Sequence, residues 1–275
     1  MTRTFASTFA EAISRALLHL PGDAGYRLAR RIVDRRHGDN DSDSATNGEL
    51  RVMRALLPRA SVVFDVGANV GDWTADALAI NPRAEIHAFE PGRATFERLR
   101  QRGFPANVHR NELALGAVEE DRPFFVFGAT NGTNSLYKRE GLAESSTESS
   151  ETVHVTTLDA YCQAAGIQHI DFLKLDVEGH EMAVLDGART MLGEGRIDYV
   201  QLEYGGTYID AGHLLRDLWS LLDRTGARYD IYKIKADGLL SVPEYRQVWE
   251  TYQYSNWLLV RSALRGSIPL PLLRR

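Results

Sequence analysis

From about residue 60 onward, apolar positions recur along the chain with two different periods. Short runs rich in β-branched and aromatic residues predict strands, and apolar residues three or four positions apart predict helices between them. The predicted strands are 62–66, 85–89, 108–110, 170–175, 198–202, 229–234 and 256–260, and the predicted helices are 73–80, 93–102, 182–191 and 213–225. This alternation predicts an α/β fold with a mostly parallel seven-stranded sheet, helices on both faces, and the last two strands as a hairpin-like edge.

Other segments flank or interrupt this alternation. Three β-rich runs at 124–127, 135–138 and 153–155 predict a small β insertion, and the polar, low-complexity stretch 144–151 predicts a mobile loop. Apolar spacing predicts N-terminal helices over 4–20 and 24–36. We therefore divide the chain into an N-terminal helical extension and linker (1–50), a main domain (51–265) and a C-terminal tail (266–275).

The two N-terminal helices admit two interpretations. Their apolar stripe and the arginine-rich face of the second helix are compatible with peripheral docking on an anionic membrane. We favour the commoner alternative, in which they pack as a cap on the main domain or on the second subunit of a homodimer. Arg15 and His19 interrupt the first apolar stretch, so a signal peptide is not supported, and no apolar run is long enough to be a transmembrane segment.

Composition narrows the class of protein. Of the 275 residues, 44% are apolar and 25% are charged, as in ordinary globular proteins. The formal net charge of -5 gives no general attraction to a polyphosphate, so nucleic acid is not an expected partner. The single cysteine, Cys162, cannot form an intrachain disulfide, which fits a reducing compartment and predicts a cytoplasmic protein.

Polar residues follow the first two predicted strands, where open α/β sheets bind ligands. From Asp65 onward the chain forms a turn with Gly67 and Gly71 that leads directly into a helix, whose first N–H groups can hold a carboxylate or a phosphate. The turn matches neither GxxxxGK[ST] nor GxGxxG. After the second strand, Glu90 is placed to accept both hydroxyls of a ribose. Together these residues describe a nucleoside with a small polar or zwitterionic tail, a description that S-adenosylmethionine fits.

Two further strand ends carry polar residues. Asn111 and Glu112 end the third strand and are placed either to hydrogen-bond an adenine ring or simply to form a turn. The segment 174–181 reads Lys-Leu-Asp-Val-Glu-Gly-His-Glu, and ionisable side chains crowded in this way repel one another, which favours a functional role over a structural one. Glu203 ends the next strand and is expected beside them.

Taken together, these motifs resemble the FkbM-type methyltransferases, which are S-adenosylmethionine-dependent O-methyltransferases. The matching segments cover about residues 60–260 and are FDVGANVG at 64–71, FEP at 89–91, ALG at 114–116, TTLD at 156–159 and FLKLDVEGHE at 172–181. Many methyltransferases share the first segment, but its combination with the last is specific. The resemblance implies a class I methyltransferase (Rossmann-like) fold with Asp65, Gly67, Asn69, Gly71 and Glu90 around the cofactor.

Methyl transfer from a sulfonium needs an acceptor oxygen held in line with the methyl group and a base for its proton. The candidate bases are His180, whose ordinary pKa suits neutral conditions, and Asp176, which is better placed at the strand end. We hypothesise that a hydroxyl of a sugar, a glycoconjugate or a secondary metabolite docks above Asp176, Glu178 and His180, with Tyr204 and Tyr208 lining an apolar wall.

The carboxylates also allow a second mechanism. Asp176, Glu178 and Glu203 offer oxygen ligands for Mg²⁺, which would lower the pKa of the acceptor hydroxyl. Two alternatives from other classes stay open at this point. An NAD-dependent oxidoreductase also binds a ribose with an acid after the second strand, although the missing GxGxxG disfavours it, and a non-catalytic binding module could retain a methyltransferase fold.

Overall fold

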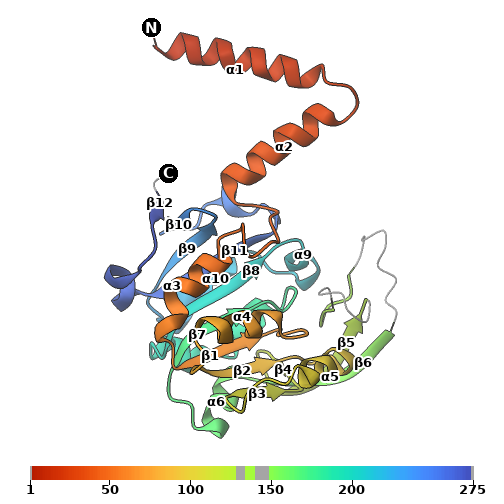
Figure 1. Ribbon diagram of the computed structural model, residues 1–275, viewed down its shortest axis with the longest axis vertical. Coiled ribbons are helices and arrows are strands. Elements are labelled where there is room, and N and C mark those ends of the chain that lie inside the picture. The colour runs from red at the N-terminus through yellow and green to blue at the C-terminus, as the bar shows by residue number, and fades with distance from the viewer. Residues whose placement is uncertain (1, 128–133, 140–148, 274–275) are drawn as a thin grey trace.

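The computed structural model of the chain describes residues 2–127, 134–139 and 149–273 (Figure 1). Within these residues a nine-stranded sheet has the order β12-β10-β9-β11-β8-β7-β1-β2-β3. Five neighbouring strands are parallel, namely β3 (Val108–Asn111), β2 (Glu85–Phe89), β1 (Val62–Val66), β7 (Ile170–Leu175) and β8 (Ile197–Tyr204). They are followed by β11 (Ser255–Arg261) and β9 (Tyr229–Lys235), which are antiparallel to their neighbours, and by β10 (Gly238–Ser241) and β12 (Leu272–Leu273).

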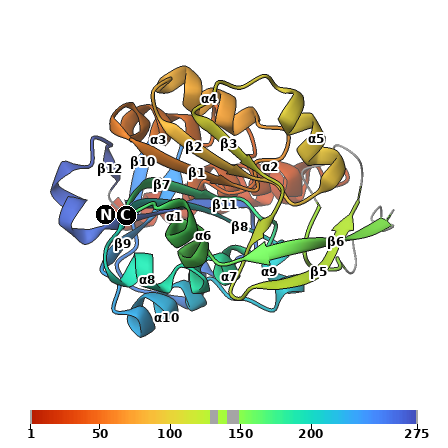
Figure 2. The same ribbon diagram turned by 90° about the horizontal axis from the view of Figure 1, so that it is seen from below.

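Helices cover both faces of this sheet (Figure 2). One face carries α3 (Glu49–Leu56), the 3₁₀ turn η1 (Leu57–Arg59), α4 (Asp72–Ile80) and α5 (Arg93–Gln101). The opposite face carries α6 (Leu158–Ala165), α7 (Glu181–Asp186), α8 (Arg189–Gly193) and α10 (Arg216–Thr225). The short helix α9 (Thr207–Ala211) follows β8, and the 3₁₀ turns η2 (Gln247–Trp249) and η3 (Ser262–Ser267) flank β11.

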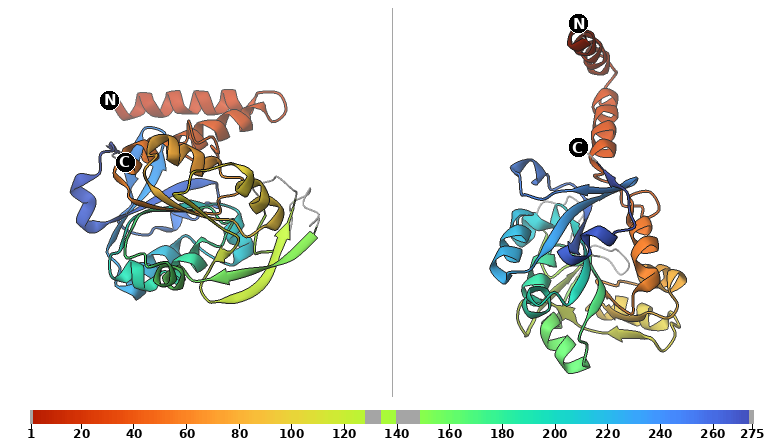
Figure 3. Two further views of the ribbon diagram at one scale, coloured as in Figure 1. Left: turned by 60° about the horizontal axis from the view of Figure 1, so that its bottom comes forward. Right: turned by 90° about the vertical axis from the view of Figure 1, so that its left-hand side faces the viewer.

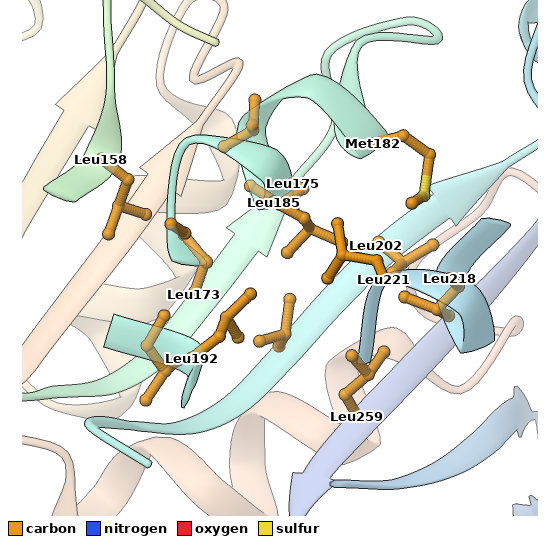
Figure 4. Packing of buried hydrophobic residues seen from close by; sticks show 14 of the residues in the cluster. Leu158, Leu173, Leu175, Met182, Leu185, Leu192, Leu202, Leu218, Leu221 and Leu259 are labelled. Atoms are coloured by element: carbon orange, nitrogen blue, oxygen red, sulfur yellow. The ribbon is translucent and has the colours of Figure 1, made fainter. Parts of the chain in front are cut away.

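Each face of the sheet has its own apolar core. Leu173 and Leu202 belong to the larger core, in which they pack with side chains of α7, α8 and α10 such as Leu185 (Figure 4). On the opposite face, Phe172 packs in a second core with Met53 of α3. Neighbouring residues of β7 therefore serve different cores, and this explains why the strand is a continuous apolar run rather than an alternating one.

The main sheet differs from the expected one at its far edge. β9 and β11 pair antiparallel, as expected, but among the described residues β10 and β12 extend the sheet from seven strands to nine. β9 is therefore not an edge strand. β12 has only two residues, and Leu272 pairs with Leu239 of β10, so the tail contributes a strand too short to show a period in the sequence.

Two helices also differ from their predicted bounds. The helix expected over 182–191 is broken into α7 and α8 around Gly187, because the chain passes close to another loop there. A Cβ at Gly187 would lie 1.9 Å from the carbonyl oxygen of Gly116, so only glycine allows this approach. The helix expected from residue 213 begins at Arg216.

The predicted β insertion is a separate three-stranded sheet of β4 (Ala114–Leu115), β6 (Ser149–Thr156) and β5 (Glu120–Val126), in that order. A bridge between Phe125 and Ser135 adds the following segment to it. Phe124, Leu136 and Val153 form its small core. Of the stretch expected to be a mobile loop, residues 144–148 lie outside the described residues, whereas 149–151 begin β6 and are ordered by pairing with β5.

The N-terminal helices α1 (Thr2–Leu18) and α2 (Ala24–His37) extend away from the main domain (Figures 1 and 3). Apolar side chains of α2 remain exposed, Ile32 by 57% and Val33 by 53%, so these helices are not the expected cap on the main domain. The linker after α2 is anchored by a buried ion pair between Asp39 and Lys233. In the described part of the chain, none of the helices is both long and apolar enough to cross a membrane.

Candidate active site

A small pocket lies beyond the carboxyl ends of β1, β2 and β7. It is lined by Gly67, Asn69, Glu90, Pro91, Thr95, Phe124, Asn134, Asp176, Val177 and Glu178. Three sequence motifs from distant parts of the chain thus meet at one edge of the sheet, because parallel strands bring their carboxyl ends to the same side. The β insertion supplies Phe124 and the nearby Asn134, so it closes one side of the pocket.

The turn after β1 depends on a close approach to the turn after β7. Gly67 has a φ of 81°, and a Cβ there would lie 1.8 Å from the carbonyl oxygen of Asp176. The backbone N–H groups of Gly67 and Ala68 donate to the carbonyl oxygen of Phe89 at 3.0 and 2.9 Å. Asn69 also has a positive φ, 48°. Asparagine tolerates this conformation better than most residues.

Glu90 presents a buried carboxylate to the pocket. Its Oε2 accepts a hydrogen bond from the backbone N–H of Asn69 at 3.0 Å, and its Oε1 accepts one from the N–H of Gly92 at 2.9 Å. Burial raises the pKa of Glu90 to about 7. The two backbone donors fix the plane of the carboxylate, and each oxygen retains a lone pair for another donor. The carboxylate can therefore accept hydrogen bonds from two neighbouring hydroxyls of a ligand.

Lys174 connects two carboxylates beneath the pocket. Its Nζ lies 3.2 Å from Oδ1 of Asp65 and 3.3 Å from Oδ2 of Asp176. Burial opposes the charged ammonium, but Asp65 and Asp176 more than offset this and raise the pKa of Lys174 above its usual value. Asp65 is completely buried and also accepts a hydrogen bond from Oγ1 of Thr74 at 2.6 Å. Asp65 therefore holds Lys174 below the pocket instead of lining it.

Glu178 lines the pocket and is fixed by the segment that follows β5. Its backbone has a φ of 54°, its carboxylate forms an ion pair with Arg139, and its carbonyl oxygen accepts from Oγ of Ser135 at 2.9 Å. Burial and the neighbouring Asp176 raise the pKa of Glu178 to about 7, although Arg139 opposes the shift. Local sequence patterns do not reveal Arg139 and Ser135, because they meet Glu178 across about 40 residues of chain.

His180 lies behind the pocket rather than in its wall. It is 2% exposed, and its Nδ1 forms a hydrogen bond of 2.9 Å with the hydroxyl of Tyr137. Burial, together with the positive charge of Arg122, lowers the pKa of His180 to about 3, so the ring is neutral at pH 7. A Cβ at Gly116 would lie 2.9 Å from its Nε2. The imidazole therefore links α7 to the β insertion.

A second layer of acids and tyrosines lies beneath Asp176 and Glu178. Glu181 accepts hydrogen bonds from the N–H groups of Val177 and Gly179 at 3.0 and 3.4 Å, and burial raises its pKa to about 8. Burial raises the pKa of Glu203 well above its usual value, and the charges of Asp176, Glu178 and Glu181 act in the same direction.

The two tyrosines expected to line the acceptor site are core residues. Tyr204 and Tyr208 are each 1% exposed, and their rings meet edge to face at 4.9 Å. The hydroxyl of Tyr204 donates to Glu250 at 3.2 Å and accepts from the N–H of Tyr252 at 2.9 Å. Among the described residues, neither tyrosine contributes to the wall of the pocket.

The remaining residues assigned to the cofactor lie outside the pocket. Asn111 donates to the carbonyl oxygen of Ala88 and accepts from the hydroxyl of Tyr161, so it connects β2, β3 and α6. Glu112 lines a separate groove beside α5. Gly71 precedes α4, and a Cβ there would lie 2.6 Å from Cδ1 of Leu99, which makes it a packing glycine.

Asp176, Glu178 and Glu203 do not form a compact ligand set. The described clusters whose ligand atoms all lie within 4.8 Å of one another are elsewhere, at Glu85 with His87 and His109, and at His169 with Asp171 and Asp198. Lys174 and Arg139 already pair with the carboxylates of Asp176 and Glu178.

The fold and the pocket together define a class of protein. The order β3-β2-β1-β7-β8-β11-β9, with β11 antiparallel, is that of the class I methyltransferases, and an acid beyond β2 is where such folds hold a ribose. A model of the methyltransferase FkbM domain matches residues 65–229. The chain belongs to the FkbM methyltransferase family and is a methyltransferase. This favours methyl transfer over the oxidoreductase and the non-catalytic alternatives.

Two named relatives are similar over most of the chain. Hexuronic acid methyltransferase AglP of Haloferax volcanii is 31% identical over 196 residues, which are 69% of this chain and 74% of the relative. The 2-O-methyltransferase NoeI of Sinorhizobium fredii is 25% identical over 209 residues, 71% of this chain and 84% of the relative. Among solved structures, the plantazolicin methyltransferase BpumL is 9% identical, with 91% of this chain and 94% of that chain covered and a TM-score of 0.43.

Proposed function

We propose that this chain is an S-adenosylmethionine-dependent O-methyltransferase whose acceptor is a hydroxyl of a sugar or glycoconjugate. The observation that carries the proposal is the carboxylate of Glu90, held by two backbone N–H groups in the same pocket as Asp176. The family supports methyl transfer. The name of AglP supports a sugar acid as acceptor, and the name of NoeI supports an oxygen atom as the site of methylation.

The residues of the pocket fit S-adenosylmethionine. Glu90 accepts the ribose hydroxyls, and Gly67 lets the turn after β1 approach the backbone of Asp176, so that both turns line the pocket. Asp176 and Glu178 supply negative charge for a cationic sulfonium. When bound, the cofactor supplies a methyl group on an electron-poor sulfur. Asp65 and Lys174 stay below and fix the side chain of Asp176.

Glu178 is the base that we assign to the acceptor hydroxyl. It lines the pocket, and a carboxyl with a pKa near 7 can take a proton at neutral pH more readily than an ordinary one. Asp176 shares the pocket and orients the hydroxyl, and its interaction with Nζ of Lys174 fixes the position of its carboxylate. His180 acts through Tyr137 as a positioning residue for the β insertion.

We propose that this transfer needs no Mg²⁺. The cations of Lys174 and Arg139 already compensate the charge of Asp176 and Glu178, so a metal would have to displace them. The alternative with Mg²⁺ on Asp176, Glu178 and Glu203 predicts that chelation abolishes turnover. We expect turnover in EDTA to equal turnover without it, and added Mg²⁺ not to increase turnover.

The proposed activity can be tested with methyl-labelled S-adenosylmethionine and a panel of hexuronic acids, oligosaccharides and glycolipids. We expect label in a methyl ether of a sugar hydroxyl, and loss of that label in Glu178→Gln. Glu244→Gln, which changes an exposed carboxylate near β10, is the matched control. Label on a nitrogen or a carbon atom, or no label with any acceptor although the donor binds, would contradict the proposal.

We further propose that the N-terminal helices hold the enzyme at the cytoplasmic face of an anionic membrane. Leu28, Ile32 and Val33 of α2 are 45%, 57% and 53% exposed, beside several arginines of the same helix. An apolar face next to basic residues favours an anionic lipid surface. The cytoplasmic location is supported by the unpaired thiol of Cys162.

Co-sedimentation with vesicles separates this proposal from a homodimer. We expect binding to vesicles that contain phosphatidylglycerol, little binding to phosphatidylcholine alone, and loss of binding in Ile32→Asp. A stable dimer in light scattering that dissociates in the same variant, without vesicle binding by the wild type, would instead assign the exposed face of α2 to a second copy of the chain.

A further inference from the structure

A cluster of nitrogen and oxygen ligands lies at the start of β2, away from the methyl-transfer pocket. His87 of β2 and His109 of β3 are partners in the parallel register, and Glu85 lies two residues before His87 on the same face of the strand. The two imidazole rings stack with centroids 4.6 Å apart. Five residues of strand separate Glu85 from Glu90, a distance of roughly 16 Å.

The spacing of the ligand atoms suits a tetrahedral metal ion. Nε2 of His87 lies 3.4 Å from Oε1 of Glu85, and Nε2 of His109 lies 3.0 Å from the same oxygen. Ligands bound to Zn²⁺ at about 2.0–2.2 Å in a tetrahedron stand about 3.3–3.5 Å from one another. The two distances to Oε1 of Glu85 are therefore within a few tenths of an ångström of those in a liganded site, and the half-exposed ring of His109 has to turn out of its stack with His87 to complete it.

The orientation of His87 is the independent observation that points to a ligand. Its side chain is 4% exposed, and its Nε2 has no hydrogen-bond partner among the described residues. Its Nδ1 lies 2.8 Å from the hydroxyl of Tyr161, which donates at 3.2 Å to Oδ1 of Asn111. With the hydroxyl of Tyr161 donating to Asn111, it accepts from His87, and we assign this tautomer of the neutral ring, in which Nδ1 carries the proton and Nε2 turns a lone pair to the cluster.

Tyr161 and Asn111 thus form an outer layer of the kind that orients metal-binding histidines. The amide nitrogen of Asn111 in turn donates to the carbonyl oxygen of Ala88 at 3.1 Å, which ties the layer to β2. We propose that Glu85, His87 and His109 bind one Zn²⁺ ion, with a water molecule as the fourth ligand. The ion would clamp β2 to β3 at the amino-terminal end of the strands.

The other compact cluster, around His169, does not have these properties. Oδ2 of Asp171 accepts from the N–H groups of Ser61 and Val62 at 2.8 Å each. Asp198 pairs with Arg261 at 2.8 Å. The two carboxylates of this cluster therefore already accept hydrogen bonds or pair with a cation within the protein. His169 provides the matched control, because it is a surface histidine beside two acids.

The test uses the full untagged chain, stripped of metal and titrated with Zn²⁺ against a chromophoric chelator. We expect one ion per chain in the wild type, and an affinity at least 100-fold weaker in His109→Ala, which removes a half-exposed ligand without opening a core. Tyr161→Phe should keep the stoichiometry and weaken the affinity about 10- to 100-fold, because it removes only the outer layer. His169→Ala should bind like the wild type.

Cobalt gives a second readout that does not depend on affinity. Co²⁺ in the wild-type chain should show the visible absorption of a four-coordinate ion with nitrogen and oxygen ligands, and His109→Ala should lose it. Equal Zn²⁺ affinity in wild type and His109→Ala, or loss of binding in His169→Ala, would overturn the proposal. Because the cluster is separate from the pocket, methyl transfer by His109→Ala at low temperature should stay near the wild-type value.

Discussion

Replacement of Glu90 by glutamine tests the cofactor pocket most directly. The carboxylate accepts one backbone N–H on each oxygen, from Asn69 and from Gly92, and this leaves one lone pair on each oxygen for a hydroxyl of the ligand. The amide of glutamine keeps one such oxygen and turns an NH₂ group toward the other backbone donor. Glu90→Gln therefore loses one charge-assisted hydrogen bond to the ligand.

The magnitude follows from that single bond. A hydrogen bond to a charged group contributes about 1.5–3 kcal/mol, and each 1.4 kcal/mol is about tenfold in affinity. We therefore expect the dissociation constant for S-adenosylmethionine to rise about 10- to 150-fold. The backbone bond is lost in both the free and the bound protein, so that part of the change lowers stability and not affinity.

Calorimetry at several pH values distinguishes a binding role from a structural one. Burial gives Glu90 a pKa of about 7, and the ionised form is the better acceptor, so wild-type affinity should rise as the pH increases through 7. Glu90→Gln should lose that dependence, and the exposed control Glu244→Gln should keep it. A Glu90→Gln variant that is folded by circular dichroism and binds within threefold of the wild type at pH 8 would refute the reasoning.

Three further outcomes follow from the same geometry. Glu178→Gln should lower kcat about 10²- to 10⁴-fold, well beyond any rise in the donor KM from the lost charge, and a loss confined to KM would remove Glu178 as the base. Gly67→Ala should destabilise the domain by more than about 3 kcal/mol in urea unfolding, because its Cβ would overlap the carbonyl oxygen of Asp176, and wild-type stability would contradict this close approach. Between about pH 6.5 and 8.5 the unfolding free energy should fall as pH rises. Glu90, Glu178 and Glu181 have native pKa values of about 7, 7 and 8, above the ordinary 4.5, so the native state holds protons that it loses in this window. An unfolding free energy that rises with pH here would contradict these shifts.

The parts of the site that follow strands could be predicted from the sequence. Gly67, Glu90 and Asp176 each end a run with a clear strand period, and the parallel arrangement alone brings such ends together. The same logic placed Asn111 with them, but its strand lies at the outer edge of the sheet. There its side chain forms hydrogen bonds with Tyr161 and with the backbone of β2. A position at a strand end is therefore not sufficient to place a residue in the pocket.

The contacts that complete the site are non-local and leave no local signal. Arg139 reaches Glu178 from the segment after β5, and Lys174 meets Asp65 across more than 100 residues of chain. Tyr208 is expected in the wall of the acceptor site, whereas it is buried in the core, where its ring in α9 meets that of Tyr204 at the end of β8. Amphipathic spacing predicted α2 correctly, but spacing does not specify what covers an apolar face.

The buried acids connect the stability of the domain with its choice of ligand. Glu90, Glu178 and Glu203 have pKa values above the ordinary range chiefly because burial disfavours their charge. A cation that enters the pocket compensates that charge and thereby recovers free energy that the empty domain forgoes at neutral pH. The methyl donor carries a positive sulfur and its demethylated product does not, so we expect Glu178, which lines the pocket, to favour the donor over the product.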